Sequence, residues 1–303
     1  MKKFLSMILA VMMLLSLTAC AEAPVMKVAS PAGAPGLALA TLAMQNPENY
    51  TFVAAETISA EFASAQADFI VAPINAGAKL FKMGKSTYQL AAVVSWGNLF
   101  FASQKEGFKV EDMNGAKVVL FGENTINASV VRYALEKNGI VPAEVEYLGS
   151  AANTQALLLS DAEAIVVTAE PALTASKMKN DKITAYAVND LYKAATGFDG
   201  YTQAGLFVKA ETAANQPEAV EAFLKLVEEA CLANAENIPA VAEAAVALEL
   251  LPNVKVATNA IPGCAVKYVN AWEAKEQVEQ TANVDLTQFG GAVPADAFYY
   301  GAK

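Results

Sequence analysis

The chain has 303 residues, of which 31 are acidic and 21 are basic, and its formal net charge is −10 without a single histidine. The negative balance argues against nucleic acid as a partner, because phosphate contacts need clustered Lys and Arg, and the missing histidines exclude Ser-His triads and His-based zinc hydrolases. A hydrophobic content of 55% with 17% charged residues indicates a folded chain, and at this length two domains or lobes are expected rather than one.

The N-terminal segment has the pattern of an export signal. Lys2 and Lys3 precede an apolar run from Phe4 to Leu15, which is shorter than the roughly 20 residues of a transmembrane helix. The following residues, 17–20 (LTAC), resemble the lipobox of a bacterial lipoprotein. This resemblance implies that residues 1–19 are removed, that Cys20 is lipidated, and that the protein lies outside the cytoplasmic membrane. The alternative is an ordinary cleaved signal in which Cys20 is incidental.

Strand, loop and helix alternate in the first part of the remaining chain. After a tether at residues 20–25 we expect two such units, each with turn-forming residues between its strand and its helix. In chain order they are a strand at 26–29, a loop at 30–36 and a helix at 37–44, then a strand at 67–72, a loop at 73–76 and a helix to Leu80. Units of this kind build a mainly parallel α/β sheet.

The same pattern returns in the second part of the chain. The expected elements are a strand at 117–121, a loop at 122–127 and a helix at 128–137, then a strand at 162–167 and a helix opened by residues 168–171. Two similar α/β halves follow from this pattern, although chance repetition of a common unit gives the same reading.

Two extended runs, 90–101 and 204–209, are long enough to carry the chain between the halves. We therefore predict an α/β fold with two lobes, two hinge crossings and a central ligand cleft. Lobe I comprises 26–103 and 208–303, and lobe II comprises 104–207. Helices expected near 217–234, 238–250 and 269–280 should pack mainly on lobe I.

The loops at the carboxyl ends of the strands are the expected binding region. Their backbone N–H groups and helix N-termini suit a small polar or singly anionic molecule. Asn75, Thr125 and Asn127 are either ligand contacts or helix caps, and the same choice holds for Glu170. Trp96, next to Asn98 at the first crossing, either stacks on the ligand or is a buried hinge residue.

The only arginine and the two cysteines beyond Cys20 are the remaining residues considered. Arg132 is the only arginine in the chain and is expected at a surface or between the lobes. Cys231 and Cys264 either form a disulfide or remain buried thiols, since the sequence does not show whether they approach each other.

Several segments together resemble the substrate-binding lipoproteins of ABC importers, in the branch of nitrate, sulfonate, taurine and thiamine-precursor binders. Besides the lipobox, they are 67–79 (ADFIVAPINAGAK), 95–98 (SWGN), 115–127 (GAKVVLFGENTIN), 169–174 (AEPALT) and 200–209 (GYTQAGLFVK). The resemblance implies the type II periplasmic-binding fold with ligand contacts from loops of both lobes. Those contacts map to Pro31, Gly33, Ala34, Asn75, Trp96, Asn98, Thr125, Asn127 and Glu170. Sulfonate and nitrate binders often add basic side chains or His near the anion, and this chain departs from that pattern.

The expected function is that of a lipid-anchored, monomeric receptor that closes around a small molecule and delivers it to an ABC permease. It needs no cofactor, no metal and no catalysis in this interpretation. Two alternatives remain from the sequence: an enzyme on the same fold, of the pyrimidine or menaquinone precursor type, and a lipoprotein that senses a ligand and signals to a membrane partner.

Overall fold

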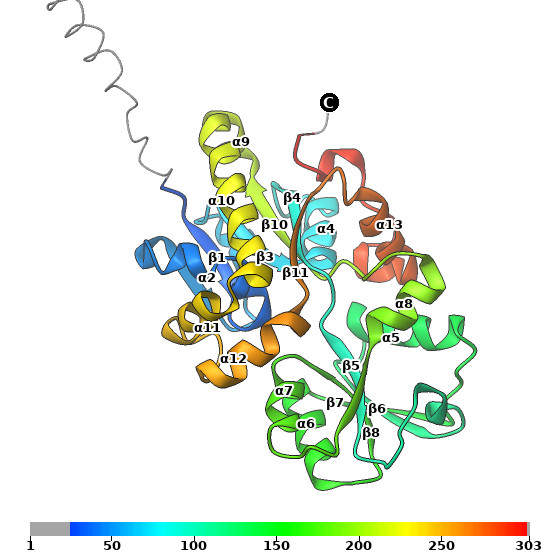
Figure 1. Cartoon of the computed structure of the whole chain (residues 1–303). Helices are drawn as coiled ribbons and strands as arrows, with labels where there is room; N and C mark the ends of the chain where they lie inside the picture. Colours follow the sequence, from blue (N-terminus) through cyan, green and yellow to red (C-terminus); the bar gives the residue numbers. More distant parts are fainter. Residues whose placement is uncertain (1–24, 302–303) are drawn as a thin grey trace, which may run out of the picture.

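The computed structural model describes residues 25–301 and contains two β-sheets, each flanked by helices. Figure 1 shows them as two bodies joined by connecting strands, with the six-stranded sheet in lobe I and the five-stranded sheet in lobe II. The predicted two-lobe α/β fold is therefore confirmed. The signal at 1–19, Cys20 and the tether up to residue 24 lie outside the described residues.

Lobe I is built on a mixed sheet. Its strands, in spatial order, are β11 (Val266–Asn270), β4 (Tyr88–Ser95), β10 (Ala204–Lys209), β3 (Phe69–Pro73), β1 (Val28–Pro31) and β2 (Tyr50–Val53). Its helices are η1 (Ala34–Ala38), α2 (Ala40–Ala43), η2 (Pro47–Asn49), α3 (Ser59–Ser64), α4 (Ile74–Lys82), α9 (Ala210–Asn215), α10 (Pro217–Glu236), α11 (Ile238–Ala247), α12 (Val254–Ala260), η4 (Ile261–Cys264), α13 (Lys275–Val284), η5 (Leu286–Phe289) and η6 (Asp296–Phe298).

Lobe II repeats this plan on a smaller scale. Its strands, in spatial order, are β7 (Glu144–Leu148), β6 (Lys117–Phe121), β8 (Ile165–Ala169), β5 (Leu99–Ser103) and β9 (Thr184–Ala187). Its helices are η3 (Val110–Met113), α5 (Ile126–Lys137), α6 (Ala151–Ser160), α7 (Ala172–Lys177) and α8 (Val188–Thr196).

Side chains that alternate along the central strands divide the core of lobe I into two layers, one on each face of the sheet. In β3, Phe69 and Val71 face a cluster that includes residues of α10, whereas Ile70 and Ala72 face a second cluster that includes residues of α3 and α4. Because side chains alternate across a strand, a continuous apolar run of this kind is buried on both faces. Helices therefore cover both sides of the sheet.

The two strands that follow the crossings run against their neighbours. In lobe II β5 is antiparallel to β8 and β9, and in lobe I β10 is antiparallel to β3 and β4. The expectation of mainly parallel sheets is thus wrong, since only the strands on the β1 and β6 sides pair in parallel. The sheets also divide the chain slightly earlier than the expected lobe boundaries, because residues 99–103 pair in lobe II and residues 204–207 pair in lobe I.

The C-terminal part holds the lobes together. Residues 266–270 form β11 and α13 begins only at Lys275, so the helix expected at 269–280 was placed too early. While α11 packs within lobe I, α12 also contacts α7 of lobe II and α13 also contacts α5 of lobe II. The expectation that this part packs mainly on lobe I is therefore correct for α11 but incomplete for α12 and α13.

Two expectations about single residues are resolved. Cys231 and Cys264 are free and buried, and burial raises the pKa of the Cys231 thiol to about 12. Arg132 is exposed on α5, as expected.

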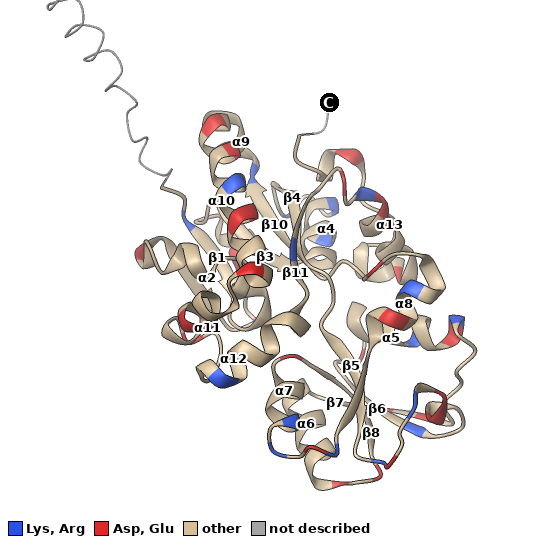
Figure 2. Ribbon diagram, viewed as in Figure 1, with Lys and Arg blue, Asp and Glu red and all other residues tan. Residues whose placement is uncertain are grey.

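Figure 2 shows the charged residues spread over helices and loops of both lobes. None of the helices between residues 25 and 301 has the length and apolar character needed to cross a membrane.

Candidate functional site

A cavity of about 310 Å³ lies between the two lobes, where strand ends meet helix starts. It draws on the ends of β1 and β3, the beginnings of α4 and α5, and the second crossing. The lining residues are Pro31, Ala32, Pro35, Ala55, Pro73, Asn75, Ala76, Thr125, Ile126, Asn127, Gln203, Ala204 and Gln288. Four of the predicted site residues are thus brought together: Pro31, Asn75, Thr125 and Asn127.

The two helices that open at the cavity begin with the same three residues. Residues 74–76 start α4 in lobe I, residues 126–128 start α5 in lobe II, and both read Ile-Asn-Ala. The first turn of a helix leaves N–H groups without intrahelical acceptors. The hydroxyl of Thr125 caps α5 by accepting from the N–H of Ala128 at 3.3 Å. Each lobe therefore presents an asparagine and the start of a helix to the same space.

The two asparagines differ in the hydrogen bonding of their Oδ1 atoms. The Oδ1 atom of Asn75 is buried without a hydrogen-bond partner. The Oδ1 atom of Asn127 accepts from the hydroxyl of the fully buried Tyr201 at 3.2 Å, which orients the amide so that its Nδ2 atom remains free to donate. Because Oδ1 of Asn75 is closed to solvent, it does not face the open cavity, whereas the amide of Asn127 is held in one orientation by Tyr201.

Gln203 forms part of the cavity wall and also links the two crossings. Its Oε1 atom accepts from the hydroxyl of Ser95 at 3.2 Å, and its Nε2 atom donates to Oδ1 of Asn98 at 3.1 Å. Asn98 in turn donates to the carbonyl oxygen of Glu170 at 3.0 Å. Asn98 is therefore a buried hinge residue that contacts Gln203 rather than the cavity.

No lining residue carries a charged side chain. Helix N-termini stabilise a nearby anion by about 0.3–1 kcal/mol each, rising to about 2 kcal/mol when partly buried. Removing a carboxylate-sized ion from water costs several kcal/mol. Two helix starts alone offset only part of that cost, so the cavity is better suited to neutral groups than to a strongly anionic one.

Trp96 lies at the hinge but lines a different cavity of about 380 Å³, between the α8–β10 connection and β11. Its indole N–H donates to the carbonyl oxygen of Lys267 at 2.9 Å, and its backbone N–H donates to that of Ala265 at 3.1 Å. These bonds tie the first crossing to lobe I. The structure therefore places Trp96 as a half-buried hinge residue, apart from the cavity that Asn75 and Asn127 share.

Two more predicted residues from the first loop do not line the cavity. Gly33 has a φ of 88°, which a glycine adopts without strain, and it precedes η1. Ala34 is buried in the cluster formed with α11 and α12. Both shape the turn after β1 that places Pro31 and Pro35 at the cavity.

Glu170 caps α7 and also touches lobe I. Its carboxylate accepts from the backbone N–H of Thr174 at 3.1 Å and from the Thr174 hydroxyl at 2.9 Å. Burial raises the pKa of the Glu170 carboxyl, although these bonds lower it in part. A Cβ atom on Gly263 of η4 would lie 2.8 Å from Cγ of Glu170. Of the two roles left open by the sequence, the structure supports the cap, with a packing contact between lobes added to it.

The lobes meet again beside α5. The Ser129 hydroxyl donates to Oδ2 of Asp285 at 2.8 Å, and the Gln288 amide donates to the carbonyl oxygen of Asn124 at 2.9 Å. Burial acts to raise the pKa of the Asp285 carboxyl, but hydrogen bonds from Thr287 and Ser129 outweigh it and hold the pKa below its usual value. Contacts between the lobes therefore lie on both sides of the cavity.

Sequence reasoning missed two polar lining residues, Gln203 and Gln288. A polar residue directly before a buried strand at a predicted crossing was a usable signal for Gln203. Gln288 follows α13 in a region with no strand–loop–helix unit, and no local pattern marked it. Within residues 25–301, no group of three or more Cys, Asp or Glu side chains is placed to hold a metal ion.

Comparison with known proteins gives one family and several similar structures. The family described as NMT1/THI5 like matches residues 36–239. A structure described as an ABC transporter from Parabacteroides distasonis is 19% identical, with a TM-score of 0.79 over 92% of this chain and 100% of that one. The periplasmic aliphatic sulphonate binding protein SsuA from Escherichia coli is 15% identical, with a TM-score of 0.71 over 92% of each chain.

A third similar structure is the ligand binding component of an ABC-type import system from Staphylococcus aureus with zinc bound. It is 11% identical, with a TM-score of 0.65 over 92% of this chain and 98% of that one. At these identities the likeness shows a shared fold. No curated protein sequence matches the chain.

Proposed function

Because the chain belongs to the NMT1/THI5-like family, we propose that it is the solute-binding component of an ABC importer. In this proposal a small polar or singly charged organic molecule enters the cavity, and the lobes close around it by bending at the two crossings. This role is supported by similar structures that are named as an ABC transporter, as the ligand binding component of an ABC-type import system and as a periplasmic binding protein.

One observation carries the proposal: polar groups of both lobes converge on a single cavity. Asn75 reaches it from α4 and Asn127 from α5, while Gln203 lies at the crossing between them. A molecule that contacts both lobes favours the arrangement in which they are close, and this differential contact drives closure.

The residues that line the cavity favour a binding role over a catalytic one. Neither a carboxylate, an amine nor a thiol is among the lining side chains, and these groups supply most general acids, bases and nucleophiles. An enzyme on the same fold remains the alternative, and product formation by the purified protein from any retained ligand would establish it.

The placement of the protein in the cell is also part of the proposal. We place it outside the cytoplasmic membrane as a monomer, with a lipid on Cys20 holding it near its permease. Intact-mass analysis of protein taken from membranes tests this: a diacylglyceryl mass on a chain beginning at Cys20 is expected, and the Cys20→Ser variant should lack it.

Native mass spectrometry of freshly purified protein tests the binding function, because a retained small molecule appears there as added mass. The variant Ala55→Trp should abolish that retention, since Ala55 is exposed and lines the cavity. The matched control is Ala54→Trp, at the adjacent exposed residue that does not line it. Equal retention in both variants would place the ligand elsewhere.

A further inference from the structure

The cavity of about 380 Å³ that Trp96 lines has no part in the proposed function. It shares no lining residue with the cavity between Asn75 and Asn127. Lobe II and the second crossing contribute Asn189 of α8 and residues 197–200, and lobe I contributes β11 and Gln277 of α13. Its volume falls within the range of about 300–1,000 Å³ that is usual for small-molecule sites. We therefore ask which molecule its walls suit.

Two half-buried aromatic side chains, Trp96 and Phe198, form what we call the aromatic wall of this second cavity. The indole N–H of Trp96 donates to the carbonyl oxygen of Lys267 at 2.9 Å. From the other lobe, the Asn189 amide donates to the carbonyl oxygens of Trp96 and Gly97 at 2.8 and 3.0 Å. Because Trp96 is held from both lobes, its ring loses little freedom when an apolar group packs on it. The wall thus suits an apolar body.

One carboxylate and one ammonium group also line this cavity, and both are open to solvent. The side chain of Asp199 is 87% exposed, and its Oδ1 atom pairs with Lys193 at 2.7 Å. The hydrogen bond from Lys193 is the main cause that lowers the pKa of the Asp199 carboxyl, and the charge of Lys267 lowers it further. Lys267 is itself exposed and forms no ion pair within residues 25–301. The two opposite charges are therefore neighbours that do not pair with each other.

A molecule with a single charge fits these two groups poorly. A lone anion would pair with Lys267, but this lysine also borders a groove that holds Glu221, Glu228 and Glu273. A lone cation would pair with Asp199, whose charge Lys193 already balances in part. A molecule that carries one charge of each sign gains both pairs and adds no net charge to the site.

We propose that the second cavity binds a free α-amino acid with an apolar side chain. Its ammonium group pairs with Asp199, its carboxylate pairs with Lys267, and its side chain packs on the aromatic wall. Exposed ion pairs contribute little each, so the affinity is modest and the selectivity comes from meeting both charges at once. This site goes beyond the proposed function and does not depend on it.

Matched probes test the ligand class. Phenylalanine, 3-phenylpropionate and phenethylamine share a body and carry both charges, the carboxylate alone or the ammonium alone. Leucine, 4-methylpentanoate and 3-methylbutylamine form a second such set. Calorimetry on the full mature chain should show at least one amino acid binding about fivefold or more tightly than either of its singly charged analogues. Equal or tighter binding of an analogue in both sets, or no binding of either amino acid, would overturn the proposal.

Two charge variants test the assigned contacts. Asp199→Asn should weaken binding of the amino acid about two- to fivefold and leave the carboxylate analogue unaffected, whereas Lys267→Gln should weaken it similarly and leave the amine analogue unaffected. The matched controls are Asp181→Asn and Lys255→Gln, at exposed residues that do not line the cavity. If each charge variant weakened all three probes equally, the contacts would be wrongly assigned.

The location is tested separately. Trp272→Phe leaves Trp96 as the only tryptophan, and its fluorescence should change with the midpoint found by calorimetry. Ala55→Trp narrows the other cavity and should leave amino acid binding unchanged. If Ala55→Trp abolished that binding, the amino acid would lie between Asn75 and Asn127, and the second site would fail while the solute-binding role stands.

Discussion

The lobes touch on two sides of the cavity, and each side holds one carboxylate in a different setting. On the α7 side the carboxylate of Glu170 accepts its hydrogen bonds from Thr174 of α7, and the side chain packs against Gly263 of lobe I. On the α5 side Asp285 of lobe I accepts a hydrogen bond from Ser129 of lobe II. The first contact depends on shape and the second on polar bonding.

The difference is visible in how the two carboxyl groups hold a proton. Burial raises the pKa of the Glu170 carboxyl, so its ionised form destabilises the folded protein. Hydrogen bonds hold the pKa of Asp285 down, so its ionised form is stabilised by the contact it makes. We infer that closure is limited by packing on one side and strengthened by a charge-assisted bond on the other.

The largest effect is expected from adding bulk on the packed side. Gly263→Ala places a Cβ atom 2.8 Å from Cγ of Glu170, and overpacking of this kind costs about 1–3 kcal/mol. Because the clash exists only when the lobes are together, ligand affinity should fall and the radius of gyration of the liganded protein should rise. Calorimetry and small-angle X-ray scattering measure the two quantities.

The control for this variant is Gly149→Ala. There the nearest atom to an added Cβ lies at 3.5 Å, an ordinary contact, and neither glycine has a positive φ. If both variants bound ligand equally well, the α7 side would not limit closure.

A smaller effect is expected on the polar side. In the parent protein Ser129 donates to Oδ2 of Asp285, and Thr287 donates to Oδ1. The variant Asp285→Asn has a single oxygen acceptor for these two residues. Hydrogen bonds contribute about 0.5–1.5 kcal/mol each, and more when charged, so a loss of about 1 kcal/mol is expected for this half-buried residue. Urea unfolding at neutral pH measures it.

The pH dependence of this variant has a defined sign. A carboxyl whose folded pKa lies below its unfolded value of 3.8 adds stability above pH 3.8, and that stability is lost as pH falls through the folded pKa. The gap between parent and variant should therefore close in acid. A gap that persists well below pH 3.8 would mean that the charge of Asp285 is not what the contact uses.

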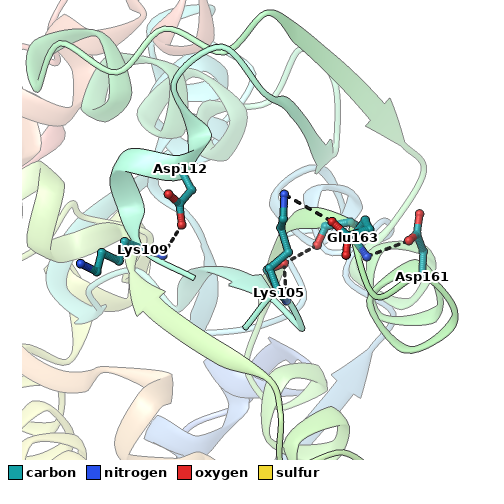
Figure 3. A network of polar contacts seen from close by, with 7 residues as sticks. Lys105, Lys109, Asp112, Asp161 and Glu163 are labelled. Carbon is teal, nitrogen blue, oxygen red and sulfur yellow. Dashed lines mark hydrogen bonds and ion pairs between the residues drawn. The ribbon is translucent and has the colours of Figure 1, made fainter. Parts of the chain in front are cut away.

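Asp112→Asn is the matched control for that variant. Asp112 is exposed on lobe II, where its Oδ2 atom accepts from the backbone N–H of Lys109 at 2.8 Å (Figure 3). This contact stays within one lobe, as do the neighbouring ones of Lys105 with Glu163. The control should alter local stability without changing ligand affinity, whereas Asp285→Asn should change both.

The sequence predicted the local elements better than the contacts between lobes. The apolar runs at β6 and β10 matched the observed strands at both ends, and Asn75 and Asn127 follow strands in the expected way. Their periodicity and turn residues are local, so short-range patterns were sufficient.

What the sequence did not predict depends on distant partners. The residues of β5 were assigned to lobe I because nothing in 99–103 specifies the antiparallel pairing with β8 and β9. Gln288 and Asp285 reach lobe II only because α13 packs on α5. Trp96 fitted two roles equally well until its indole N–H was seen to donate to Lys267.

The smallest effect is expected from Glu170→Gln. The variant keeps an oxygen acceptor for Thr174 and removes a desolvated charge, so stability at neutral pH should change by less than about 1 kcal/mol, and upward if at all. Its pH profile is the sharper readout. Because the folded pKa of Glu170 lies above its unfolded value of 4.5, the parent loses stability as pH rises from 4.5 through the folded pKa. The variant should lack that decline, which urea unfolding across this range detects. An unchanged decline in Glu170→Gln would assign it to another group and remove the contrast with Asp285.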